Sequence, residues 1–127
     1  MPPRARFRPA ERVRRRAEFQ GIYEHGYRIR GRFGTIFLLN RGTGPGRLGI
    51  AATKKLGGAV ERNRAKRLIR EIFRRNKIAP GFDVVVVPRR ELLDASLTVL
   101  EADYRALIER HLPRAERARR PPGAPGV

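Results

Sequence analysis

The chain has 127 residues, and its 30 Lys and Arg against 12 Asp and Glu give a formal net charge of +18. Its length is typical of one domain, and 40% hydrophobic residues are enough to bury a core. The chain has no cysteine, which excludes disulfides, and its two histidines are too few for a histidine-rich metal site. It also lacks the apolar run that a membrane span or a secretory signal needs, so we expect a cytoplasmic protein.

The first half of the chain predicts an arm, a helix and two strands. Residues 1–10 hold three prolines and are expected to form a disordered basic arm. Residues 11–25 have apolar side chains at helical spacing and predict a helix that ends at Gly26. Residues 27–40 and 48–53 predict two strands, and the Gly- and Pro-rich turn between them favours an antiparallel hairpin.

The second half predicts two helices around one strand. A helix is expected over about 59–76, and residues 82–87 predict a strand whose four consecutive valines indicate burial on both faces. Residues 95–112 predict a last amphipathic helix, and residues 113–127 are too rich in Pro, Gly and Arg to fold alone. We therefore expect one folded domain over residues 11–112, followed by a disordered tail.

The positive charge is concentrated in two segments. Residues 26–48 hold five arginines and no acid, and residues 53–77 hold ten basic and two acidic residues. Only four of the 30 basic residues are lysines, and the guanidinium group of arginine both grips phosphate with two hydrogen bonds and stacks on bases. This pattern predicts a nucleic-acid partner rather than a membrane or a small-molecule substrate.

The helix expected at 59–76 carries its charge on one face. At 100° per residue, a single arc holds five cations and one amide and no carboxylate; we call it the cationic stripe, and it consists of Arg62, Asn63, Lys66, Arg67, Arg70 and Arg74. Glu71 falls outside the arc, where it is expected to pair with Arg67 and Arg75. Like charges on one face repel each other, so the stripe favours a polyanionic partner, although an ordinary solvated face is the alternative.

The segment 54–71, KKLGGAVERNRAKRLIRE, resembles the signature of the bacterial ribonuclease P protein family. Two lysines, a glycine loop, Arg-Asn-Arg, Lys-Arg and a further Arg follow in the family's order and spacing, and the likeness extends over about residues 11–112. It implies an α+β two-layer sandwich, with helices packed on one mixed sheet of three to four strands. It also implies a left-handed βαβ crossover and a likeness to domains of a small-subunit ribosomal protein and an elongation factor.

The resemblance also implies a function. In this family the protein assists a catalytic RNA subunit that removes the 5′ leader of precursor tRNA by Mg²⁺-dependent hydrolysis. The chain would then be an endoribonuclease subunit without catalytic residues or protein metal ligands of its own, and Mg²⁺ would be bound mainly through the RNA. Position in the motif assigns RNA-subunit contacts to Arg62, Asn63, Arg64, Lys66, Arg67 and Arg70, and the stripe adds Arg74.

The leader-binding residues implied by the resemblance are Phe19, Tyr23, Phe37, Lys54 and Lys55. Arg16 lies beside the first two rings on the predicted helix, and aromatic rings among cations suit single-stranded RNA because stacking tolerates any base. The alternative is that these rings belong to the core.

Two other functions are weighed against this one. A ribosomal-type structural RNA-binding protein would share the charge and the fold class. A nuclease acting with its own side chains would need histidines or carboxylates grouped in a cleft, and the candidate pairs are chain neighbours expected at the surface, namely His25 with Glu24 and His111 with Glu109.

Overall fold

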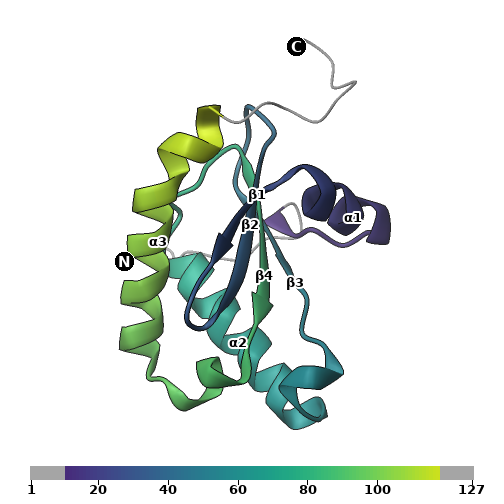
Figure 1. Cartoon of the computed structure of the whole chain (residues 1–127), viewed down its shortest axis with the longest axis vertical. Coiled ribbons are helices and arrows are strands. Elements are labelled where there is room, and N and C mark those ends of the chain that lie inside the picture. Colours follow the sequence, from purple (N-terminus) through teal and green to yellow (C-terminus); the bar gives the residue numbers. More distant parts are fainter. Residues whose placement is uncertain (1–10, 118–127) are drawn as a thin grey trace, which may run out of the picture.

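A computed structural model describes residues 11–117 as a four-stranded mixed sheet with helices on both faces (Figure 1). The expected α+β class with one mixed sheet is confirmed. The elements along the chain are α1 (Arg16–His25), β1 (Tyr27–Arg30), β2 (Gly34–Asn40), β3 (Arg47–Ile50), the 3₁₀ helix η2 (Lys54–Leu56), α2 (Ala59–Arg75), β4 (Phe82–Pro88), the 3₁₀ helix η3 (Arg90–Asp94) and α3 (Leu97–Arg117). The arm expected at 1–10 and the end of the expected tail, 118–127, lie outside the described residues. No helix within 11–117 is long and apolar enough to cross a membrane.

The strand order is β1-β2-β4-β3, and it corrects two predictions. The expected hairpin between β2 and β3 is wrong, because β4 lies between them, antiparallel to β2 and parallel to β3. Val84 and Val85 of β4 are fully buried, and a strand buried on both faces belongs in the centre of a sheet. The single strand expected at 27–40 is also wrong: the chain reverses at residues 31–33, so that β1 and β2 form the hairpin.

Two hydrophobic clusters occupy the two faces of the sheet. On one face α2 and α3 cover the larger cluster, which includes Leu38, Val84 and Ile108. On the other face α1 contacts β2 and β4 and covers a smaller cluster that includes Ile22 and Val85. The sheet with α2 and α3 thus forms the expected two-layer body, and α1 covers part of the second face (Figure 1). The handedness of the crossover through α2 and the likeness to ribosomal domains remain expectations.

Both terminal helices differ from their predicted bounds. The first begins only at Arg16, because residues 11–13 instead run beside β3, where the Val13 N–H donates to the Leu48 carbonyl at 2.9 Å. The last continues to Arg117, so the expectation of a disordered tail from 113 onward is wrong for residues 113–117. Although a proline at 113 costs one helical hydrogen bond, the helix continues because Ala115 is only 1% exposed against the core.

Candidate RNA interface

Helix α2 presents the cationic stripe on its outer face. Its opposite side is buried through Ala65, Ile69, Ile72 and Phe73, which fixes the direction of the stripe. Among the described residues, none of the five basic side chains that the motif contributes to α2 forms a salt bridge, namely Arg62, Arg64, Lys66, Arg67 and Arg70. Arg64, Arg67 and Arg70 are exposed. These five cations are therefore available to an external anion.

The C-terminal end of the stripe is partly neutralised. Glu71 forms an ion pair with Arg74 at 2.5 Å, so the expected pairing with Arg67 and Arg75 is wrong. Arg75 instead contacts Glu101 of α3 at 3.3 Å, beside the buried Asn76 that donates to the same carboxylate at 2.7 Å. The tertiary contact with α3 thus removes Arg75 from Glu71 and leaves Arg74 as its partner.

Three aromatic side chains form a row on the other face of the sheet, which we call the aromatic row: Phe19, Tyr23 and Phe37. The ring centroids of Phe19 and Tyr23 lie 6.3 Å apart, and those of Tyr23 and Phe37 lie 5.0 Å apart in an edge-to-face arrangement. Tyr23 is 41% exposed, whereas Phe37 is 9% exposed. Tyr23 is therefore the most accessible ring, and Phe37 supports it from the sheet.

A hollow of about 380 Å³ brings the two predicted groups together. The hollow is lined by Phe19 of the aromatic row together with Lys66 and Arg70 of the stripe. Its other lining residues are the apolar Val13, Leu48 and Ile50 and two further arginines, Arg12 and Arg14. Arg14 was missed by sequence reasoning, since it precedes α1 and reaches the hollow only because residues 11–13 run beside β3.

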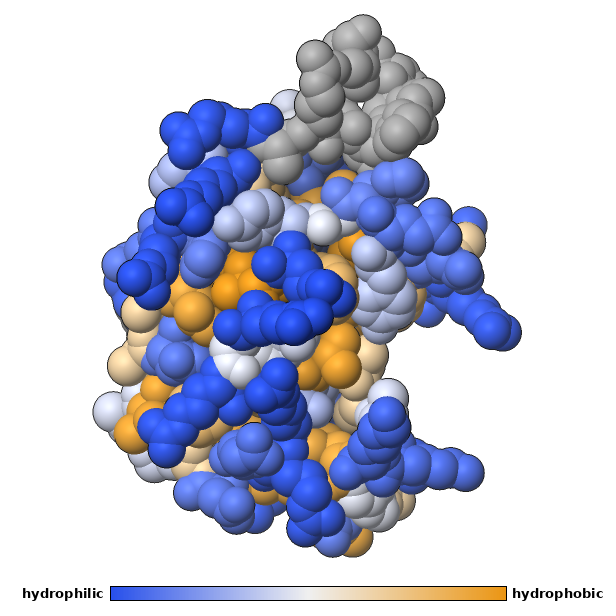
Figure 2. All heavy atoms as spheres, viewed as in Figure 1, coloured by the Kyte–Doolittle hydropathy of each residue, from blue (hydrophilic) through white to orange (hydrophobic). Residues whose placement is uncertain are grey.

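The other predicted residues lie around this hollow. A neighbouring hollow shares Arg70 and is lined by Asn63, Arg67, Arg70, Glu71 and Arg74. Lys54 and Lys55 are exposed in η2, between β3 and α2, and Arg16 is exposed at the start of α1. Figure 2 shows the surface recessed between α1 and the segment around η2, with hydrophilic side chains on both sides.

A partly buried ion cluster, centred on the buried Asp83, links α1 to the sheet. Asp83 of β4 accepts two hydrogen bonds from Arg47, at 2.7 and 2.8 Å, and Arg47 also contacts Glu18 of α1 at 2.8 Å. Burial raises the pKa of Glu18. The hydrogen bonds from the backbone N–H groups of Arg15 and Arg14 and from the Arg47 side chain together lower it by more, so the net shift of the pKa is downward. Glu18 therefore stays ionised and links the helix of the aromatic row to the central strand.

Gly49 of β3 provides the surface on which Phe19 lies. A Cβ at this position would lie 2.8 Å from two ring carbons of Phe19 and 3.0 Å from the Cβ of Val13. We expect Gly49→Ala to displace the Phe19 ring and to lower the free energy of unfolding by about 1–3 kcal/mol, as overpacking does. Urea unfolding measures the free energy, and the NMR shifts of the Phe19 ring report its displacement.

Gly21→Ala is the matched control for that substitution. Gly21 lies in α1, and no atom lies within 4 Å of the place that an alanine Cβ would take, so alanine should raise stability by about 0.5–1 kcal/mol through helix propensity. Unchanged Phe19 shifts in Gly49→Ala would contradict the role assigned to Gly49.

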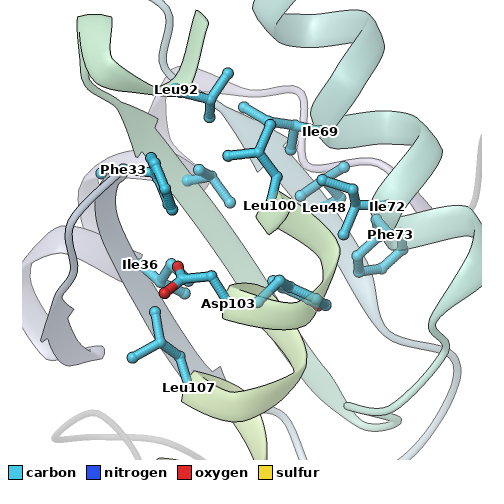
Figure 3. A pocket seen from close by; sticks show the side chains of 13 residues that line it. Phe33, Ile36, Leu48, Ile69, Ile72, Phe73, Leu92, Leu100, Asp103 and Leu107 are labelled. Atoms are coloured by element: carbon cyan, nitrogen blue, oxygen red, sulfur yellow. The ribbon is translucent and has the colours of Figure 1, made fainter. Parts of the chain in front are cut away.

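The apolar pocket beneath α3 belongs to the core. Phe33, Ile36, Ile69 and Leu100 are among its lining residues, and Asp103 is the one carboxylate that residues 11–117 contribute to it (Figure 3). Burial raises the pKa of Asp103, although Arg32 opposes this shift. None of the described lysines and arginines lines the pocket, so it does not suit a phosphate backbone.

Acid–base and metal-ligating groups are dispersed over the described residues. Nowhere in 11–117 do three His, Asp or Glu side chains group in a way that could hold a metal ion. His25 lies 3.7 Å from Glu24 on α1, while the Nδ1 of His111 lies 3.2 Å from the hydroxyl of Tyr27. Each histidine has its own local partner, and the two belong to no common site.

Comparisons with known proteins agree with the motif. The family model Ribonuclease P matches residues 7–112. The ribonuclease P protein component of Clostridioides difficile (strain 630) is 32% identical over 107 residues, which cover 82% of this chain and 94% of that protein. That of Thermotoga maritima is 42% identical over 88 residues, covering 68% and 75%. Among solved structures, the RNase P protein from Thermotoga maritima has a TM-score of 0.72 at 36% identity, covering 79% of this chain and 96% of that one. One of the Staphylococcus aureus RNase P protein has a TM-score of 0.70 at 30% identity, covering 83% and 96%.

Proposed function

Since the chain belongs to the ribonuclease P protein family, we propose that it binds the catalytic RNA subunit and the 5′ leader of precursor tRNA and so assists leader removal. The observation that carries this proposal is the shared hollow, in which Phe19 lies with Lys66 and Arg70. In this hollow, a single-stranded leader bound by the aromatic row would lie next to the RNA subunit bound by the stripe. The ribosomal-type alternative is not favoured, because the matched family and relatives are ribonuclease P proteins.

The RNA subunit is assigned to the outer face of α2. Its five cations without salt bridges in the described chain are fixed on one rigid helix, and such a face suits the phosphates of a folded RNA. Asn63 is exposed beside them and can both donate to and accept from a 2′-hydroxyl. Arg74 contributes less than the others, because Glu71 already neutralises it.

The leader is assigned to the face of the sheet beside α1. Tyr23 and Phe19 offer stacking surfaces, each worth about 1–3 kcal/mol per base, and Phe37 supports Tyr23. Exposed cations around them would bind the leader phosphates, namely Arg16, Lys54 and Lys55. The protein would thus contact both the faces of the leader bases and the leader backbone, without a requirement for sequence.

The hydrolysis itself is assigned to the RNA subunit. We assign no catalytic residue to this chain, since general acid–base catalysis needs its groups within hydrogen-bond reach of the same substrate and the two histidines have separate local partners. Mg²⁺ would be held mainly by RNA phosphates and would supply an activated water and charge stabilisation at the scissile phosphate. The protein would lower the repulsion between the two RNAs and hold the leader in place.

Reconstitution with a bacterial catalytic RNA subunit tests the proposal. At low Mg²⁺ concentration, the protein should increase the rate of leader cleavage, because its cations replace part of the charge neutralisation that Mg²⁺ provides. It should also raise the affinity for precursor tRNA and leave that for mature tRNA, which has no leader, unchanged. A folded protein that stimulates neither cleavage nor precursor binding would refute the proposed function.

A further inference from the structure

The edge strand β1 carries two exposed arginines that the proposed function leaves unused. Arg28 and Arg30 alternate with Ile29, whose side chain is 3% exposed in the cluster beneath α2 and α3. The two arginines therefore project from the opposite face of the sheet. Arg28 lies directly opposite Phe37 in the β1–β2 register, and directly opposed residues point to the same face. Arg28 thus stands beside the aromatic row.

The strand register extends this relation across the whole sheet. One row of residues runs from Gly49 through Val85 and Phe37 to Arg28. Phe19 covers its Gly49 end, and Tyr23 covers Phe37. Four strands about 4.8 Å apart make this row roughly 14 Å long.

A second row lies next to the first, farther from α1. It runs from the half-buried Val87 through Thr35 to the exposed Arg30. Because Val87 and Thr35 are only half-buried, this row leaves an accessible floor of sheet beside the aromatic row that ends at Arg30. A cation at the edge of such a floor is placed to bind a phosphate whose base lies over the sheet.

Charge pairing within the acid-free segment 26–48 singles out the same two arginines. Arg41 and Arg47 both contact Asp83, at 2.6 and 2.7 Å, and the Arg32 guanidinium lies 5.1 Å from the Phe33 ring centroid. Within the part of the chain that the structure describes, Arg28 and Arg30 form no salt bridge. Three of the five arginines in the segment thus have a partner inside the protein, and these two are left for an external anion.

We propose that Arg28 and Arg30 bind phosphates of leader nucleotides that lie beyond the aromatic row. The single-stranded leader would then cross the sheet from the stripe side, past Phe19 and Tyr23, to the β1 edge. Single-stranded RNA fits this surface because it combines a stacking ring, a flat floor and cations at both edges. The inference rests on the proposed function and extends the leader path to a strand outside the motif.

Leader length provides the test. In the holoenzyme reconstituted with the RNA subunit, Arg28→Gln with Arg30→Gln should lower the affinity for a precursor with a long leader by roughly tenfold and reduce its log–log salt slope by about 1.4, which is 0.7 for each single-strand phosphate. The affinity for a precursor with a two-nucleotide leader, and that for the RNA subunit, should be unchanged. Both arginines are exposed, so the fold should be retained.

Arg110→Gln with Arg114→Gln removes the same charge from the exposed surface of α3 and should leave both precursors bound as before. An equal loss at both leader lengths, no loss at either, or a loss of RNA-subunit affinity would overturn the assignment of these arginines to the leader. If the unmodified protein bound long and short leaders equally well, the proposed leader-binding function itself would fail. The two failures are therefore distinguishable.

Discussion

Replacing Arg67 and Arg70 together by alanine should weaken binding of the RNA subunit by on the order of 100-fold. Both side chains are exposed on the outer face of α2 and line one hollow with Asn63. A hydrogen bond to a charged group contributes at least about 1.5 kcal/mol, so two such contacts amount to about 3 kcal/mol. The fold should be intact, because neither side chain is buried. A direct binding titration with the isolated RNA subunit measures the effect.

The salt dependence of RNA-subunit affinity provides a second measurement on the same double variant. Five cations of α2 lack a salt bridge among the described residues, so the unmodified protein should have a log–log slope of about −3.5 to −4.5, at 0.7–0.9 per phosphate. The double variant should have a slope of about −2 to −2.7. Arg110→Ala with Arg114→Ala is the charge-matched control on α3 and should change neither affinity nor slope. An unmodified slope near −1, or an unchanged affinity in the double variant, would remove α2 as the interface.

The stripe could be predicted from the sequence because helical periodicity determines which side chains share a face. The apolar residues of α2 are buried and its cations point outward, as the spacing indicates. The partner of Glu71 could not be predicted in the same way. Its choice of Arg74 over Arg75 depends on Glu101, which belongs to a helix far along the chain.

Strand pairing was the part of the fold that local sequence could not predict. The turn 41–46 has the composition of a hairpin, yet β4 separates the two strands that it joins. The valines of β4 indicated a central strand but not its neighbours, since burial on both faces is compatible with several orders. Likewise, Pro113 indicated a helix end, and the burial of Ala115 overrides it.

The hollow between α1 and α2 depends on these long-range contacts. Arg14 and Lys66 are far apart in the sequence, and they line one space only because residues 11–13 run beside β3. The sequence could therefore identify the cations of the motif helix and the rings of α1 separately. That they line one space follows from the sheet order, which places β3 at the edge of the sheet, between α1 on one face and α2 on the other.

Asp83→Ala should cause the largest loss of stability among the substitutions considered, about 3–5 kcal/mol. The Asp83 side chain is 3% exposed and accepts two hydrogen bonds from Arg47, while Arg41 lies 2.6 Å from the same carboxylate. Without Asp83, the half-buried Arg41 loses its carboxylate partner among the described residues and Arg47 keeps only Glu18, and breaking a buried ion pair is the source of this cost. Urea or thermal unfolding measures it. Glu109→Ala breaks an exposed pair, with Arg105 at 3.6 Å, and should cost at most about 1 kcal/mol.

The same substitution should affect the two RNA contacts unequally. Arg47 also holds Glu18, so without Asp83 the guanidinium is free to move and α1 loses part of its anchor on the sheet. Phe19 and Tyr23 are on that helix, whereas the stripe is on α2, which is packed on the opposite face. At temperatures where Asp83→Ala is still folded, affinity for a long leader should therefore fall more than affinity for the RNA subunit. A stability loss below about 1 kcal/mol, well under the cost of breaking a buried pair, or an equal fall in both affinities, would show that this ion cluster does not position the aromatic row.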